Sequence, residues 1–258
     1  MRILVTNDDG VRSQGLWALA ESLKEIGDVS VVAPDRDQSG IGTALTLLNV
    51  LRADEIDSPV AGVKATSVQG TPGDCVTLAI SELFAEPFDV VVSGINNGSN
   101  LGLDVLSSGT VGGALQGHIR HIPSFAISVA SLRNVQLEAA SIAARALARA
   151  LATSSGSSPP FLNVNLPNVR PEDIQRVEIT RLGPRAYLET VERGNDGRRT
   201  HYWVKHNVFA ADDPEEGTDI WAVANRRVSI TPLRLGLVGE AAGLQELADG
   251  VAAELGLR

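Results

Sequence analysis

Short apolar runs that alternate with helical patterns constrain the fold of this chain more than any other feature. The segments "VSVVA" (29–33) and "DVVVSG" (89–94) are apolar almost throughout, as expected for strands of a parallel sheet that helices cover on both faces. Further strands are predicted at 2–6, 124–129 and 161–167, with one or two weaker strands within 50–67, and helices at 16–26, 74–83, 110–119 and 137–152. The strand–helix–strand order predicts an open α/β sheet with mostly parallel strands.

The pattern changes after the loop signal "TSSGSSPP" (153–160) and the strand that follows it. The later segments predict strands without long helices between them, at 174–182, 200–205, 220–223 and 228–232, and then a weak helix at 239–257. We expect Tyr202 and Trp203 to lie in the core or in an interface, because an isolated hairpin is marginally stable in water. The predicted division is an α/β core over 1–180 and an extension over 181–258 that also returns to the core. The extension would support a dimer or larger homo-oligomer.

Composition excludes several classes of protein. The formal net charge of −9 supplies no broad basic surface, so we expect no binding of nucleic-acid polymers. We read no signal peptide at the N-terminus and no apolar run long enough for a membrane span. The single cysteine, Cys75, cannot form an internal disulfide, which is typical of a reducing cytosol. A cytoplasmic protein is therefore expected.

The segment "ILVTNDDGV" (3–11) sets two carboxylates, Asp8 and Asp9, directly after a strand. Two neighbouring carboxylates repel each other unless one takes up a proton or both share a cation. Asn-Asp-Asp-Gly is also a good turn sequence. These residues alone leave a surface turn and a metal site as alternatives.

Oxygen-bearing side chains also follow two other predicted strands, in the loops 34–40 and 95–100. In an open parallel sheet these loops lie at the same edge as Asp8 and Asp9, where ligands bind. Carboxylate, hydroxyl and amide oxygens suit Mg²⁺, Mn²⁺ or Ca²⁺ better than zinc or copper. This coincidence favours a metal site over a turn.

The segment "SSGTVGGALQG" (107–117) places hydroxyls and backbone amides at the start of a small-residue helix. Such a helix N-terminus is a ready anion site, although an ordinary Ser/Thr cap is the alternative. A cation and an anion site at one sheet edge suggest phosphoryl chemistry. The sequence holds no P-loop Gly-Lys-Ser/Thr.

Several linked motifs resemble the SurE family of stationary-phase survival phosphatases, in the order in which that family has them. They are "VTNDDG", "DQSG", "GTPGDCV", "SGINNGSNLGLDV", "SGTVGGALQG", "NVNLP" and "EGTD". The resemblance implies a Rossmann-like three-layer α/β/α core and a C-terminal part exchanged between subunits. It also implies a metal-dependent 5′- or 3′-nucleotidase, with short polyphosphate as a further substrate of some members.

The resemblance assigns roles to individual residues. The family's metal ligands correspond to Asp8, Asp9, Ser39 and Asn96. Its phosphate region corresponds to the residues Asn7, Gly40, Ser108, Gly109 and Thr110. Two positions depart from the family pattern, because Ser107 replaces the usual tyrosine and Gln116 the usual glutamate. These departures bear on substrate preference.

We therefore expect a phosphomonoesterase that hydrolyses nucleoside monophosphates with one Mg²⁺ or Mn²⁺ per subunit. Asp8 or Asp9 would anchor the metal, and one of them would orient water or act as the nucleophile. The alternative is a nucleotide-sensing module that keeps the site but does no chemistry.

Overall fold

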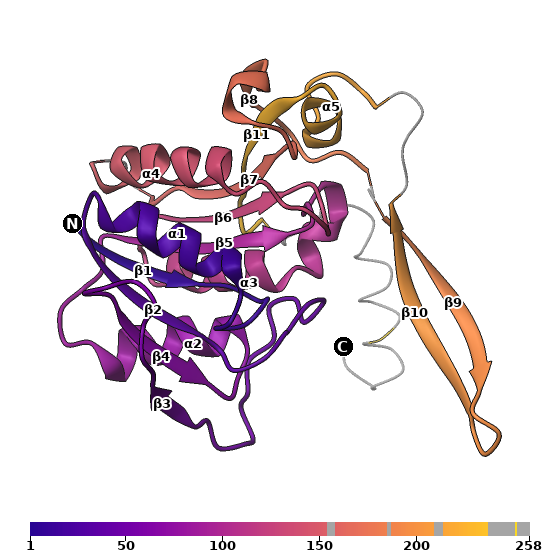
Figure 1. The fold of residues 1–258 in the computed structure, drawn as a ribbon, viewed down its shortest axis with the longest axis horizontal. Helices are drawn as coiled ribbons and strands as arrows, with labels where there is room; N and C mark the ends of the chain where they lie inside the picture. Colours follow the sequence, from indigo (N-terminus) through magenta and orange to yellow (C-terminus); the bar gives the residue numbers. More distant parts are fainter. Residues whose placement is uncertain (154–157, 185–186, 209–213, 237–250, 252–258) are drawn as a thin grey trace.

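The computed structural model describes residues 1–153, 158–184, 187–208, 214–236 and 251. Within this part, a nine-stranded sheet has the order β3-β4-β2-β1-β5-β6-β7-β11-β8 (Figure 1). Its strands are β1 (Arg2–Thr6), β2 (Asp28–Pro34), β3 (Ala53–Glu55), β4 (Lys64–Val68), β5 (Val90–Asn97), β6 (Ser124–Val129), β7 (Phe161–Leu166), β8 (Arg176–Ile179) and β11 (Arg227–Pro232). Pairing is parallel except between β3 and β4 and between β7 and β11.

Helices cover both faces of this sheet. The helices are α1 (Gln14–Lys24), α2 (Pro72–Leu78), α3 (Gly109–Ile119), α4 (Glu138–Ala152) and α5 (Asp219–Ala224), with short turns η1 (Ala79–Leu83), η2 (Gly102–Leu106) and η3 (Pro171–Asp173). Helices α1 and α4 pack on one face and α2 and α3 on the other. The three-layer, mostly parallel α/β prediction is confirmed.

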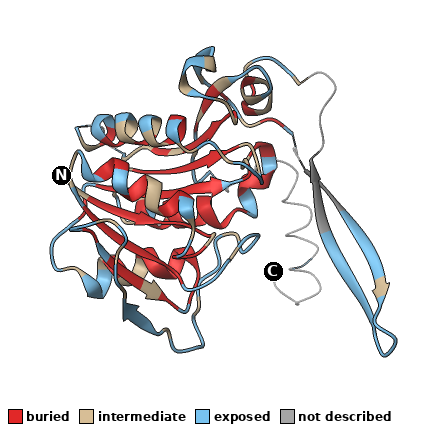
Figure 2. Ribbon diagram, viewed as in Figure 1, coloured by how far each residue is buried: buried red, intermediate tan, exposed pale blue. Residues whose placement is uncertain are grey.

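Burial on both faces explains why the central strands are apolar throughout. In β1, Ile3 and Val5 belong to the cluster under α1 and α4, whereas Leu4 belongs to the cluster under α2. Successive side chains of a strand point to opposite faces, so a strand covered on both sides needs apolar residues at every position. Figure 2 shows the strands buried at the centre and the helices exposed on their outer sides.

The predicted strand at 220–223 is wrong, because these residues lie in helix α5. The side chain of Thr218 accepts a hydrogen bond from the backbone N–H of Trp221 at 3.2 Å and caps the helix. Asp219 adds a negative charge in the first turn, where the helix dipole favours it. A short apolar run does not distinguish such a helix from a strand, and the cap decides it.

The hairpin of β9 (Tyr187–Asn195) and β10 (Thr200–Val208) extends away from the sheet (Figure 1). Tyr202 and Trp203 are 63% and 62% exposed, so the prediction that they lie in the core of this chain is wrong, and the interface stays a prediction.

Strand β11 returns to the sheet beside β7. The division at residue 180 stays a prediction, and the predicted helix at 239–257 lies outside the described residues except for Val251. No helix in the described ranges is long and apolar enough to cross a membrane.

Asp219, the first residue of α5, is hydrogen-bonded to backbone groups of three segments of the chain. Its fully buried carboxylate accepts hydrogen bonds from the backbone N–H groups of Gly102 (2.7 Å), Gly183 (2.8 Å) and Ile220 (2.9 Å). Gly102 begins η2, and a Cβ at this position would lie 1.6 Å from the carbonyl oxygen of Pro184. The carboxylate therefore fixes how the loop after β5 packs against the base of the hairpin.

We expect Asp219→Asn to lower the free energy of unfolding by about 1–3 kcal/mol, because the new amide turns a donor toward buried N–H groups. Urea unfolding measures the change. Asp173→Asn is the matched control, since the half-buried Asp173 side chain pairs with the exposed Arg170 at the surface, and its substitution should cost under about 0.5 kcal/mol. Equal effects of the two variants would contradict this role of Asp219.

Candidate functional site

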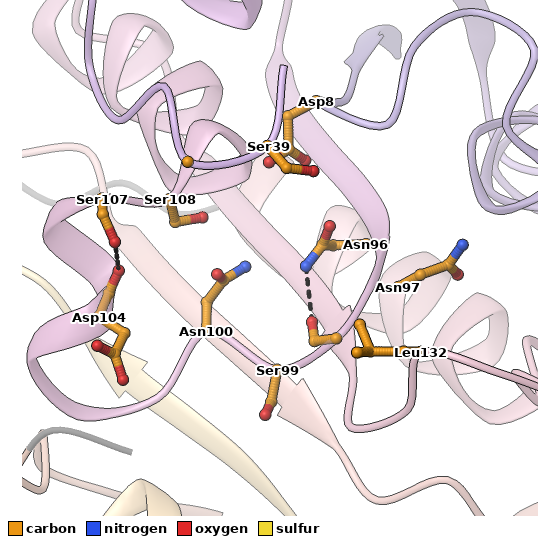
Figure 3. A pocket seen from close by; sticks show the side chains of 12 residues that line it. Asp8, Ser39, Asn96, Asn97, Ser99, Asn100, Asp104, Ser107, Ser108 and Leu132 are labelled. Carbon is orange, nitrogen blue, oxygen red and sulfur yellow. Dashed lines mark hydrogen bonds between the residues drawn. The ribbon is translucent and has the colours of Figure 1, made fainter. Parts of the chain in front are cut away.

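A cleft of about 300 Å³ lies where strand order reverses around β1 (Figure 3). The strands β2 and β5 lie on opposite sides of β1, and ligands of open α/β sheets bind beyond the strand ends at such a point. The cleft is lined by Asp8, Ser39, Gly40, Asn96, Asn97, Gly98, Ser99, Asn100, Asp104, Ser107, Ser108 and Leu132. The predicted convergence of the loops after β1, β2 and β5 is thus observed.

Asp8 lies at the inner wall of this cleft and is 4% exposed. Its Oδ1 accepts a hydrogen bond from the hydroxyl of Thr110 at 2.6 Å. A Cβ at Gly109 would lie 2.8 Å from the Cβ of Asp8, so only glycine lets the start of α3 approach this closely. Burial raises the pKa of Asp8, and the bond from Thr110 opposes that rise.

Asp9 is half-buried beside Asp8, and its Oδ2 accepts a hydrogen bond from the backbone N–H of Asn97 at 3.3 Å. Burial, followed by the charge of Asp8, raises the pKa of Asp9 to about 7, while the bond from Asn97 opposes the rise. Two carboxylates held this way favour a shared proton or a cation near neutral pH.

Ser39 and Asn96 complete the predicted ligand set, and both line the cleft with Asp8. The loop that carries Ser39 is held by a hydrogen bond from the Gln38 N–H to the carbonyl oxygen of Asp8 at 2.8 Å. The side-chain Nδ2 of Asn96 donates to the carbonyl oxygen of Gly98 at 2.6 Å. Figure 3 shows that this leaves the amide oxygen of Asn96 on the side of Asp8 and Ser39.

Of the residues predicted to bind phosphate, some line the cleft and the others are buried behind its wall. Gly40 and Ser108 line the cleft, and the hydroxyl of Ser108 caps α3 by accepting from the Val111 N–H at 3.1 Å. Asn7, Gly109 and Thr110 are buried and are not part of the cleft lining. Nδ2 of Asn7 donates to the carbonyl oxygen of Gly10 at 3.0 Å, and its buried Oδ1 has no partner among the described residues. The cap of α3 is therefore Ser108, and Thr110 supports Asp8 from behind.

Several cleft residues were not predicted as site residues. Asn97 ends β5, and Gly98, Ser99 and Asn100 follow it in the loop; the sequence predicted only Asn96 from this stretch as a site residue, although the repeated asparagines of "NNGSN" mark all of it. Asp104 comes from η2 and Leu132 from the loop after β6. No short motif marks Leu132, because only the packing of the loops brings it to the cleft.

The donors present fit a hard divalent cation. Asp8, Asp9, Ser39 and Asn96 offer only oxygen atoms that ordinarily bind Mg²⁺ or Mn²⁺. In the described ranges no group of three or more His, Cys, Asp or Glu side chains could hold a metal ion, which matches a set with only two carboxylates. A cation would also offset the burial of both carboxylates.

The chain is similar to known proteins over most of its length. The sequence profile of the family described as "Survival protein SurE" matches residues 3–189. A relative from Dehalococcoides mccartyi, named 5′-nucleotidase SurE, is 47% identical over 90% of this chain and 88% of its own. Another from Moorella thermoacetica, with the same name, is 45% identical over 92% of this chain and 91% of its own. The crystal structure of a SurE protein from Aquifex aeolicus superposes with a TM-score of 0.79 at 38% identity and covers 99% of this chain and 100% of its own.

The raised pKa of Asp9 predicts how the metal-free protein responds to pH. The pKa of the Asp9 carboxyl is about 7 in the folded protein, against the ordinary value of 3.8 that applies to the unfolded chain, so the folded state binds more protons between these values. Its contribution to stability therefore falls as the pH rises through this window. Melting temperatures in EDTA, from about pH 5 to about pH 8, should fall more in the wild type than in Asp9→Asn. If the melting temperatures of the wild type and Asp9→Asn differ by the same amount across this pH range, the raised pKa of Asp9 is contradicted.

Proposed function

The chain belongs to the SurE family, and on that basis we propose that it is a divalent-metal-dependent 5′-nucleotidase that hydrolyses nucleoside monophosphates to nucleoside and phosphate. The observation that carries the proposal is the cleft in which Asp8, Ser39 and Asn96 face the cap of α3 at Ser108. The relatives named 5′-nucleotidase SurE support it, because they match most of this chain. 3′-Nucleotides and short polyphosphate are further candidate substrates, since the same phosphate site would accept them.

Asp8, Asp9, Ser39 and Asn96 are the residues that would hold one Mg²⁺ or Mn²⁺ per subunit. When bound, such a cation supplies Lewis-acid chemistry, because it lowers the pKa of a water and offsets negative charge on phosphate. The remaining steps fall to the protein's own groups. Thr110 keeps Asp8 oriented through its 2.6 Å hydrogen bond.

The phosphate would lie between the carboxylate wall and the start of α3. Ser108 and Gly40 offer a hydroxyl and a backbone amide there, together with the positive end of the α3 dipole. Fixed donors of this kind stabilise charge that moves between oxygens as the P–O bond breaks. Asp9 is less buried than Asp8 and is our candidate for orienting the attacking water. The oxygen of this water would form the new P–O bond as the bond to the nucleoside breaks, and the proton that the water gives up to Asp9 balances the one that the leaving nucleoside oxygen takes up.

A nucleotide-sensing module without catalysis is the alternative, and no observation favours it. It would require the carboxylates only for binding, yet the cleft combines the Asp8 carboxylate with an anion site, and Asp9 lies directly beside Asp8 although it is not part of the cleft lining. Release of phosphate separates the two functions directly.

The same proposal includes a homo-oligomer in which residues 181–258 contact a neighbouring subunit. The exposed Val191, Tyr202, Trp203 and Val204 of the hairpin support it, because apolar side chains on an extended hairpin gain stability from burial. A cytoplasmic location completes the proposal, since the buried free thiol of Cys75 suits a reducing compartment.

We expect phosphate release from nucleoside monophosphates to stop in EDTA and to return with Mn²⁺ or Mg²⁺. A panel of 5′- and 3′-monophosphates with a colorimetric phosphate assay measures both the reaction and the base preference. Asp9→Asn tests the same role within the protein, because it removes one negative charge at nearly constant volume. This variant should remain inactive even with saturating metal. Full activity in the metal-free protein would exclude the proposed role of the cation.

A further inference from the structure

Strand β7 carries two asparagines, Asn163 and Asn165, which point to one face of the sheet, while Leu162, Val164 and Leu166 point to the other. Both asparagine side chains are completely buried, and their partners in register are Ala126 and Ser128 of β6 and Thr231 and Ser229 of β11. A buried amide costs free energy unless it is hydrogen-bonded, so a central strand has no reason of its own to hold two of them. Their hydrogen-bond partners therefore indicate what they do.

Both asparagines bind the main chain of one residue, Asn100, in the loop that lines the cleft. Oδ1 of Asn165 accepts from the Asn100 N–H at 2.8 Å, and its Nδ2 donates to the Asn100 carbonyl oxygen at 3.0 Å. Nδ2 of Asn163 donates to the same carbonyl oxygen at 2.7 Å. Asn100 lies beyond the end of β5, and no strand in the described part of the chain pairs with it. The two side chains thus make the hydrogen bonds to the Asn100 main chain that the backbone of a neighbouring strand makes elsewhere in a sheet.

The side chain of Asn100 extends from this fixed backbone toward Asp8. Its Nδ2 donates to the Ser128 hydroxyl at 2.9 Å and to Oγ1 of Thr110 at 3.4 Å. The Thr110 hydroxyl in turn donates to Oδ1 of Asp8 at 2.6 Å. Because Asn100 occupies a lone pair of the Thr110 oxygen, the Thr110 proton is directed to the Asp8 carboxylate. Figure 3 shows the Asn100 side chain in the cleft, below Ser108 and Asn96.

We propose that Asn163 and Asn165 are positioning residues for the site, and that they act by clamping the Asn100 main chain. The proposal rests on the proposed function, since the reaction it serves is phosphate-ester hydrolysis at this cleft. The clamp sets the floor of the cleft and the direction of the Thr110 hydrogen bond to Asp8. The buried Oδ1 of Asn163 has no partner among the described residues, so stability alone does not favour asparagine there.

Asn168 provides a matched control three residues further along the chain from Asn165. Its side chain also clamps main-chain groups, because Oδ1 accepts from the Gln136 N–H at 2.7 Å and Nδ2 donates to the Asn134 carbonyl oxygen at 3.2 Å. Asn134 and Gln136 do not line the cleft themselves, whereas Leu132 of the same loop does. Asn168→Ala therefore removes a similar clamp from main-chain groups that do not line the cleft.

The experiment compares Asn165→Ala, Asn165→Asp and Asn168→Ala with the wild type. Asn165→Asp keeps the side-chain volume and the acceptor for the Asn100 N–H. It replaces the donor to the Asn100 carbonyl oxygen by a carboxylate oxygen, which that carbonyl repels. This variant therefore tests the clamp even if the alanine variant does not fold. We expect both Asn165 variants to lower kcat/KM for a nucleoside monophosphate about 10- to 100-fold, as misplacement of a binding group does. Affinity for Mn²⁺ alone should change less than about threefold, because losing the clamp alters the direction of the Thr110 hydrogen bond to Asp8 but removes no ligand oxygen.

A second measurement does not depend on turnover. Calorimetry of inorganic phosphate binding to the Mn²⁺-loaded protein should show roughly tenfold weaker binding in both Asn165 variants and no change in Asn168→Ala. Equal losses in the Asn168 control, or wild-type phosphate affinity in Asn165→Asp, would overturn the clamp. If the wild type releases no phosphate from nucleotides, the proposed function fails, and the phosphate affinities alone still decide on the clamp.

Discussion

The burial of the Asp8 carboxylate at the end of β1 is the constraint on which the rest of the site depends. It lies at the centre of the sheet, 4% exposed, with Asp9 directly beside it. Removing a carboxylate from water is costly unless hydrogen bonds or opposite charge compensate. The groups that approach Asp8 include the hydroxyl and the backbone N–H of Thr110 and, at the backbone oxygen of Asp8, the Gln38 N–H. These groups are uncharged, so the negative charge of Asp8 stays uncompensated, and a divalent cation would offset it.

Close approach of α3 to the sheet follows from the same constraint. Gly109 allows the start of the helix to contact Asp8, and a Cβ at Gly113 would lie 2.9 Å from the Ser93 hydroxyl oxygen. Larger residues at these positions would push the helix and Thr110 away from the carboxylate. The loop after β5 is then held from the far side, at Asn100 by Asn163 and Asn165 and at Gly102 by Asp219. Site geometry therefore depends on strands and helices that contribute no ligand themselves.

The strand and helix patterns were sufficient for the layers of the fold, and strand-end topology was sufficient for the convergence of the loops that carry Asp8, Ser39 and Asn96. The choice of Ser39 and Asn96 within those loops came from the family resemblance. The sequence was insufficient where a short apolar run fits two elements and where a contact between distant segments decides the outcome. Residues 220–223 were read as a strand because the cap at Thr218 is a single local bond, and apolar runs of this length fit either element. The role of Asn163 and Asn165 was not visible, since their partner is 63 and 65 positions away.

Binding of Mn²⁺ to the metal-free protein, followed by calorimetry, tests the central claim most directly. The account predicts one Mn²⁺ per chain in the wild type. It also predicts at least about 100-fold weaker binding in Asp8→Asn, because the substitution removes a charged ligand and leaves the fold in place. Asp89→Asn, at a surface carboxylate that accepts from the Arg2 N–H, should bind Mn²⁺ as the wild type does. Equal Mn²⁺ affinity in the wild type and in Asp8→Asn would contradict the account.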